Sequence, residues 1–146
     1  MTLRNFSMSI AFGAALLAAC STTPPPVEVT LSATDFRYEP ASVEVLVGQQ
    51  VTVTMQNMGT LEHDFVIQEI PLEVKAGESG SEVMAGHTMD EMEVEPAVHM
   101  GATTGMSSSV TFVPTKPGTY EFFCAVPGHR EAGMVGTLMV REREPV

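Results

Sequence analysis

The chain from Val27 onward consists mostly of short runs in which apolar or β-branched residues alternate with polar ones, and turn-forming residues separate these runs. Such alternation is typical of strands that bury one face. The runs predict strands over 27–33, 43–47, 51–57, 63–67, 109–113, 119–124 and 134–140, with a turn or short strand over 35–40. Because almost no helical periodicity interrupts them, the predicted fold class is all-β, a two-sheet antiparallel sandwich.

Two connections and one long segment stand out from this pattern. Gly48-Gln49-Gln50 predicts a hairpin between its flanking strands, and Pro114-Thr115-Lys116-Pro117-Gly118 predicts a tight turn. Residues 69–108 break the alternation because they are acidic and rich in glycine, serine and methionine. We interpret this segment as a long excursion from the sandwich, with room for a short helix.

The N-terminus has the pattern of an export signal. Arg4 precedes an apolar run over 10–19, about half of the roughly 20 residues that a membrane-spanning helix needs. The end of this run, Leu17-Ala18-Ala19-Cys20, resembles the bacterial lipoprotein signal, in which the cysteine is lipidated; an ordinary signal with a chance cysteine is the alternative. We therefore expect a protein of the bacterial cell envelope, lipid-anchored through Cys20 on the extracytoplasmic face of a membrane. The predicted divisions are a signal peptide, a lipidated cysteine with a proline-rich tether, and one folded domain: 1–19, 20–26 and 27–146.

Charge narrows the possible partners. The formal net charge is −11 with only seven lysines and arginines, so a nucleic-acid partner is excluded, because phosphate binding requires clustered basic residues. Residues 61–100 contain ten of the acids and a single base, Lys75, which predicts one strongly acidic region. That region either keeps the protein soluble or steers a basic partner, and the charge alone does not choose between the two.

The chemistry is concentrated in residues 120–134. A predicted strand ends at Cys124, a Pro-Gly turn follows so that His129 can point back, and the next strand begins at Met134. His63, which opens its own strand, is the natural fourth member of this set. A lipidated Cys20 cannot form a disulfide, which leaves Cys124 as the thiol of the folded domain.

Two histidines, one cysteine and a weakly bound methionine are the ligand set of a trigonal blue-copper site. Thiolate and thioether suit Cu(I), whereas imidazole suits both oxidation states, so little rearrangement accompanies electron transfer. Taken singly, Met134 and Cys124 could be core residues and His63 a strand-end histidine, but their combination argues against chance. Zinc is disfavoured because a thioether is a poor zinc ligand. Catalysis of the multicopper type is disfavoured because the chain has only four histidines and no His-Cys-His triplet, so we expect no enzyme.

A family resemblance supports this interpretation. The segment from Gly118 to Val140 resembles the copper-loop strand pair of the cupredoxins, and the resemblance extends back to Val27. Four residues separate Cys124 from His129 and four more precede Met134, a spacing similar to that of auracyanins and close to that of azurins. The resemblance implies a cupredoxin-like Greek-key sandwich that binds one type 1 copper. The implied copper ligands are His63, Cys124, His129 and Met134.

The resemblance also implies a function. Auracyanins are membrane-associated one-electron carriers, so the expected partners are a redox-protein donor and acceptor, such as cytochromes or a quinol-oxidising complex, and the expected state is a monomer. The resemblance also places His129 at a partly exposed apolar end of the sandwich. The residues expected around it are Met58, Pro127, Gly128 and Gly133.

Two features depart from the family pattern. Asp64 stands where many members have an asparagine that hydrogen-bonds to the cysteine loop. The excursion over 69–108 contains soft copper donors whose alternative role is copper delivery or storage. A flexible cover on the sandwich is the interpretation we favour, because no repeated spacing marks a site. These donors are Met84, His87, Met89, Met92, His99, Met100 and Met106.

Overall fold

The computed structural model describes residues 23–73 and 95–144. The predicted signal peptide, the predicted lipidation site Cys20 and the greater part of the acidic excursion lie outside these ranges. Four of the soft copper donors in this excursion also lie outside the described ranges: Met84, His87, Met89 and Met92. Within the described ranges, no helix is long and apolar enough to cross a membrane.

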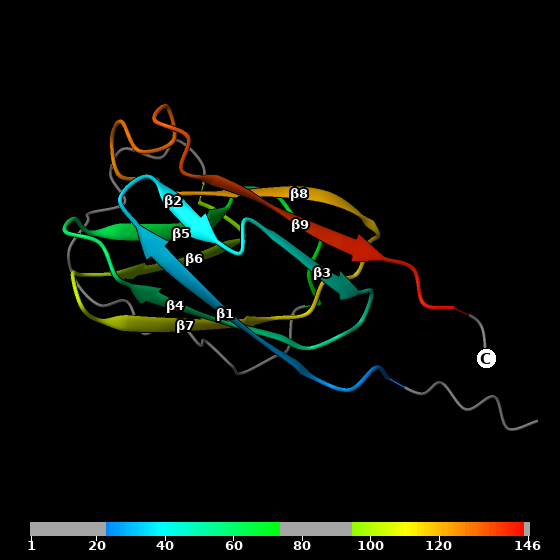
Figure 1. Cartoon of the computed structure of the whole chain (residues 1–146). Helices are drawn as coiled ribbons and strands as arrows, with labels where there is room; N and C mark the ends of the chain where they lie inside the picture. The colour runs from blue at the N-terminus through cyan, green and yellow to red at the C-terminus, as the bar shows by residue number, and fades with distance from the viewer. Residues whose placement is uncertain (1–22, 74–94, 145–146) are drawn as a thin grey trace, which may run out of the picture.

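Within residues 23–73 and 95–144, nine strands form two sheets that pack face to face (Figure 1). The four-stranded sheet has the order β2 (Arg37–Glu39), β1 (Val27–Thr34), β4 (Val51–Asn57) and β7 (Ser107–Phe112). The five-stranded sheet has the order β3 (Ser42–Leu46), β9 (Val135–Arg141), β8 (Gly118–Phe123), β5 (His63–Ile67) and β6 (Val98–Ala102). The predicted all-β, two-sheet sandwich is therefore confirmed.

The pairing inside the sheets is not purely antiparallel as predicted. β1 runs parallel to β4, with Val27 opposite Val51, and β3 runs parallel to β9. The predicted hairpin at 48–50 is wrong, because β3 and β4 belong to different sheets. The turn instead carries the chain across the sandwich, with Gly48 at a φ of +74° in the left-handed region that suits glycine. The alternation of residues within a strand does not predict which of the two sheets the strand joins.

The end of the predicted excursion belongs to the sandwich. Residues 98–102 form β6, which pairs antiparallel with β5, and β7 begins at Ser107. β6 buries Val98, Met100 and Ala102 and leaves the residues between them partly exposed, as expected of a strand with one inward face. The sequence did not predict this strand, because it is short, contains a glycine with weak β-propensity and lies among polar residues.

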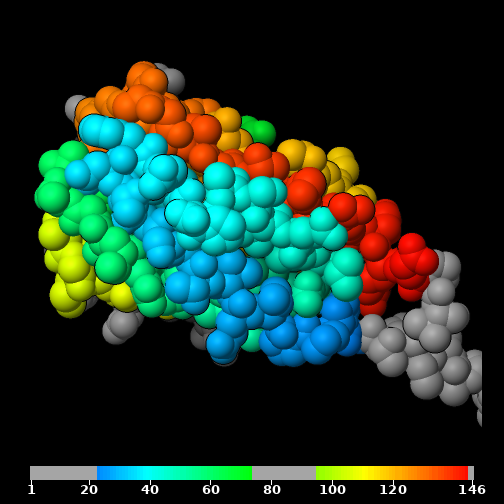
Figure 2. All heavy atoms as spheres, in the orientation of Figure 1, coloured from blue at the N-terminus to red at the C-terminus, as the bar shows by residue number. Residues whose placement is uncertain are grey.

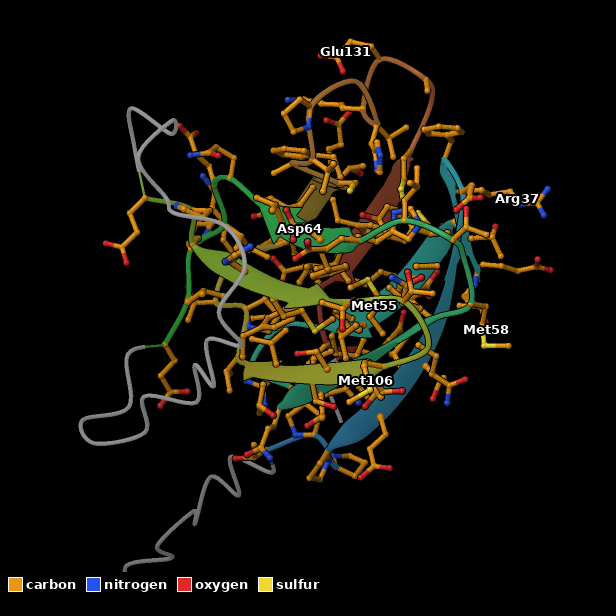
Figure 3. The ribbon with its side chains drawn as sticks, turned by 90° about the vertical axis from the view of Figure 1, so that its left-hand side faces the viewer. Arg37, Met55, Met58, Asp64, Met106 and Glu131 are labelled. Carbon is orange, nitrogen blue, oxygen red and sulfur yellow. The ribbon has the colours of Figure 1, made fainter. Side chains whose placement is uncertain are left out.

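The core lies between the two sheets and is built by the inward residues of each strand. Fully buried side chains of both sheets meet there, including Leu31, Met55, Phe65, Phe122 and Leu138. Burying each such side chain stabilises the fold by about 1.5–3 kcal/mol. Figure 3 places Met55 between the sheets.

Three turns and one loop meet at one end of this sandwich. The β1–β2 turn, the β4–β5 turn, the β6–β7 turn and the loop over 124–134 all lie at the left of Figure 1. The space-filling view of Figure 2 shows the loop packed beside the β1–β2 turn at this end. The residues with candidate chemistry come from these connections, so the fold gathers them although they are distant in sequence.

Candidate metal centre

Three of the predicted ligands converge at this end. One ligand atom from each of His63, Cys124 and His129 lies within 4.8 Å of the other two, and all three residues are buried. The Cys124 Sγ lies 3.4 Å from the His129 Nδ1. In the described part of the chain this is the one cluster of histidine, cysteine or carboxylate groups with metal-binding geometry.

The loop over 124–134 is closed by its own backbone. The N–H of Cys124 donates to the carbonyl of Met134 at 3.1 Å, and the N–H of Met134 donates to the carbonyl of His129 at 3.0 Å. Gly128 and Gly133 have φ values of +84° and +102°, which a residue with a side chain would adopt only with strain. The loop therefore holds Cys124 and His129 in fixed relation, and Met134 is fully buried at the start of β9.

His63 is presented by the turn between β4 and β5. The buried side chain of Asn57 organises this turn, because its Nδ2 donates to the carbonyls of Leu61 and Ala102 at 2.7 and 2.8 Å. Its Oδ1 accepts a hydrogen bond from the N–H of Gly59 at 2.9 Å. One asparagine thus ties β4, the turn and β6 together immediately before His63.

The sulfur of Cys124 accepts a hydrogen bond from the backbone of β5, the strand that lies beside β8 in the sheet. The N–H of Asp64 donates to the Sγ at 3.3 Å, and the hydroxyl of Tyr38 donates to the carbonyl of the same Asp64. Burial raises the pKa of the Cys124 thiol, although the backbone N–H groups near it act in the opposite direction. Burial also raises the pKa of Tyr38, so its phenol stays protonated and remains a donor.

The hydrogen bond from residue 64 to Cys124 does not depend on the side chain at this position. The link to Cys124 comes from the backbone, which any residue type supplies, while the carboxylate Oδ1 lies 3.8 Å from the Nε2 of His99. An aspartate at position 64 therefore keeps this backbone bond, which is separate from a bond made by the side chain of an asparagine. Figure 3 shows the side chain of Asp64 on β5 at this end of the sandwich.

The surroundings of His63 fit a metal. Both of its ring nitrogens are buried and neither has a hydrogen-bond partner among the described residues. A buried polar atom without a partner costs about 1–3 kcal/mol, and a metal bond would remove that cost. Burial, followed by the neighbouring His129, lowers the pKa of His63, which favours the neutral imidazole that binds metals.

A family comparison decides the identity of the fold and its metal. Residues 25–141 match the family described as copper binding proteins, plastocyanin/azurin family. The chain belongs to this family. Copper is therefore the cofactor expected from the sequence and supported by the structure, because His63, Cys124 and His129 form a site consistent with type 1 copper.

Among relatives of this plastocyanin/azurin-family protein, two are named copper-resistant cuproprotein CopI. The protein from Rubrivivax gelatinosus is 37% identical over 116 residues, which cover 79% of this chain and 66% of the relative. The protein from Pseudomonas aeruginosa is 28% identical over 138 residues, covering 79% of this chain and 75% of the relative. The chain thus spans just under two thirds of the length of the first relative. Auracyanin-B of Chloroflexus aurantiacus is 58% identical over 36 residues, 25% of this chain and 15% of that protein.

Solved auracyanins share the fold. Reduced auracyanin from Roseiflexus castenholzii superposes with a TM-score of 0.59 at 26% identity, over 78% of this chain and 96% of that one. Auracyanin B gives a TM-score of 0.59 at 23% identity, over 83% and 91% of the two chains. The similarity to auracyanin B, at 23% identity, shows the fold alone. The predicted similarity to auracyanins is confirmed.

In this family member, the outer side of His129 is covered by an aromatic ring. Phe36 meets the ring of His129 edge-on, with centroids 5.1 Å apart, and only 5% of His129 is exposed. Phe36 is itself partly exposed and has a φ of +65°, an uncommon conformation for a residue with a side chain. Sequence reasoning missed this contact, although an aromatic residue in a short polar turn was a usable signal.

The connections at this end carry exposed apolar side chains, while His129 itself is buried. Exposed apolar side chains come from the turns and from the start of β9: Phe36, Met58, Leu61, Met106 and Val135. Figure 3 shows Met58 pointing away from the ribbon, and Glu131 at the tip of the loop over 124–134. Met58 was expected near His129, and Met106 was named from the sequence only as a soft copper donor. His99 and Met100 lie on β6, where Met100 is a core residue.

Proposed function

We propose that this protein is a one-electron carrier that uses a single type 1 copper. The observation that supports this most strongly is the buried convergence of one thiol and two imidazoles at one end of a rigid sandwich. Bound copper would supply a Cu(I)/Cu(II) couple there. The residues that would hold the copper are His63, Cys124, His129 and, as the weakest donor, Met134.

The protein's own residues would keep the site suited to electron exchange. The loop over 124–134 is clamped by backbone hydrogen bonds at both ends, so its donors cannot move far when the charge of the site changes. The hydrogen bond from the N–H of Asp64 stabilises negative charge on the Cys124 sulfur. Burial excludes water as an additional ligand, which disfavours substrate chemistry and supports a carrier rather than an enzyme.

The proposed location rests on the N-terminal sequence. A lipid on Cys20, after removal of residues 1–19, would anchor the domain to the extracytoplasmic face of a bacterial membrane through the tether over 20–26. The proposed partners are a redox-protein donor and acceptor, and the proposed state is a monomer. Mass spectrometry of the membrane-purified protein should show a diacylglyceryl adduct on Cys20, which Cys20→Ser should abolish together with membrane retention.

A second candidate is copper delivery, storage or resistance. It is favoured by the two relatives whose names describe them as copper-resistant cuproproteins. The methionines and histidines over 84–106 other than the core residue Met100 would then bind copper in addition to the buried site.

Copper titration with voltammetry separates the two candidates. A carrier should saturate at one copper per chain and show a reversible one-electron wave that accounts for all of the bound copper. A copper-handling protein should bind further copper that produces no such wave and is lost when His87 and His99 are both replaced by alanine. Additional copper of that kind would contradict the carrier proposal.

A further inference from the structure

A carboxylate from the β1–β2 turn faces the far side of His63. The Oδ1 of Asp35 lies 3.6 Å from the Nε2 of His63, slightly farther than a hydrogen bond. Asp35 is held in place by Thr60, whose N–H donates to Oδ1 at 2.9 Å and whose hydroxyl donates to Oδ2 at 2.8 Å. The β1–β2 and β4–β5 turns therefore meet at this carboxylate.

The contact is enclosed on one side by a glycine. A Cβ on Gly59 would lie 2.5 Å from the Asp35 Oδ1 and 2.8 Å from the His63 Nε2, so no larger residue fits there. The Nε2 of His63 is buried and makes no hydrogen bond within the described residues. The carboxylate of Asp35 thus faces the Nε2, and the backbone of Gly59 lies beside the pair.

The two nitrogens of His63 have different surroundings. Because the Nε2 faces Asp35, the Nδ1 is the nitrogen left for the cluster with Cys124 and His129. Metal-binding histidines commonly donate their second N–H to a carboxylate, which fixes the tautomer and raises the basicity of the ligand. Asp35 stands where such a partner is needed.

We infer that Asp35 is a positioning residue for the copper site, acting through His63. Its carboxylate keeps the proton on Nε2, leaves Nδ1 for the metal and adds a negative charge that favours Cu(II) over Cu(I). The inference rests on the proposed function, because it requires His63 to be a copper ligand. It assigns to the β1–β2 turn a role in setting the reduction potential.

The charge of Asp35 can be removed with little change of shape. Asp35→Asn can still accept the N–H of Thr60, but it no longer offers a carboxylate to His63. The reduction potential should rise because Cu(II) loses a favourable charge, by about tenfold in the redox equilibrium, which is about 59 mV for one electron. The Cu(II) affinity should fall by about 10- to 100-fold. An unchanged potential would overturn the inference.

Thr60→Val is the matched control. It removes the hydroxyl bond to Oδ2 and keeps the carboxylate, so it tests whether the turn alone sets the potential. The expected change in the redox equilibrium is less than twofold. A shift as large as that of Asp35→Asn would show that Asp35 acts only by supporting the turn, and would overturn the inference.

A measurement on the unmodified chain is independent of how the variants fold. In the diamagnetic Cu(I) protein, the His63 imidazole should show an exchange-protected Nε2–H proton resonance and no proton on Nδ1. A proton on Nδ1 would overturn the inference. Failure of the proposed function is distinguishable, because the unmodified chain would then lack the thiolate–copper absorption altogether, whereas failure of this inference leaves that absorption intact.

Discussion

At the scale of single residues, the site combines donors of different strength. Cys124 and the two histidines lie within bonding reach of one centre, and Met134 is buried at the end of the same loop. A weak fourth donor influences the potential more than the stability, because it forms little of the metal's bonding. Met134 can therefore be tested without dismantling the site.

Met134→Leu should keep the colour of the site and raise its reduction potential. Leucine has a similar volume, so the loss in folding free energy should stay below about 1.5 kcal/mol. Replacing the thioether by an apolar group favours Cu(I), and roughly a tenfold change in the redox equilibrium is expected. Voltammetry measures the shift, and an unchanged potential would remove Met134 from the ligand set.

Gly136 is required by core packing rather than by conformation. A Cβ at this position would lie 2.1 Å from the Cζ of Phe122 and 2.9 Å from the carbonyl of Ala41. Gly136→Ala should reduce the free energy of unfolding by about 1–3 kcal/mol, as measured by urea denaturation. Ser107→Ala, at an exposed strand position, is the control and should change it by less than about 0.5 kcal/mol. Equal stability of the two variants would contradict this packing.

Residues differ in how far the sequence predicts them. The spacing of Cys124, His129 and Met134 in one loop is visible in the sequence, and the structure brings the first two together with His63. Asp35 and Phe36 could not be found in this way, because their contacts with the histidines arise only when the β1–β2 turn packs against the site. Local spacing predicts ligands within one loop, but groups that act from other turns depend on tertiary packing.

At the scale of elements, the site residues lie in or next to the connections between strands, and the strands fix the positions of these connections. Asn57, the last residue of β4, bonds to the backbone of the β4–β5 turn and of β6. The strands β4 and β5 were predicted with the bounds that the structure shows, whereas β6 and the crossover at 48–50 were not predicted. Strand patterns are local, but sheet membership depends on partners distant in sequence.

Asn57→Ala should weaken the fold more than its size suggests. The substitution leaves two carbonyls and one N–H without their partner, and each unsatisfied buried group costs about 1–3 kcal/mol before water compensates. We expect a loss of about 2–3 kcal/mol in the free energy of unfolding. Gln56→Ala, on the exposed face of the same strand, should lose less than about 0.5 kcal/mol. A loss below 1 kcal/mol for Asn57→Ala would contradict its role.

At the scale of the whole molecule, all proposed ligands lie at one end of the sandwich, as Figure 1 shows for the connections that carry them. A metal bound there would join β5 to the β8–β9 loop and so would couple two parts of one sheet. The family and the copper were predicted from the loop spacing and are confirmed. The acidic character over 61–100 remains a sequence prediction, because most of that segment lies outside the described residues.

Copper should stabilise the whole domain. A ligand that binds only the folded state at 100 times its dissociation constant adds about 2.7 kcal/mol. We expect the copper-loaded protein to melt at a Tm roughly 10 °C above that of the chelator-treated protein. Cys124→Ala is the control, since most of this difference should disappear when the thiol is absent. Equal melting of the loaded and copper-free wild-type proteins would contradict a structural copper site.

The most direct test of the central claim is the absorption and EPR spectrum of the oxidised, copper-loaded chain beside that of Cys124→Ser at equal copper content. The wild-type protein should show one intense band near ~600 nm and a narrow copper hyperfine splitting, because a thiolate binds the metal. Both features should be lost in the variant. A colourless wild-type protein, or a variant that keeps the band, would contradict a carrier site built on Cys124.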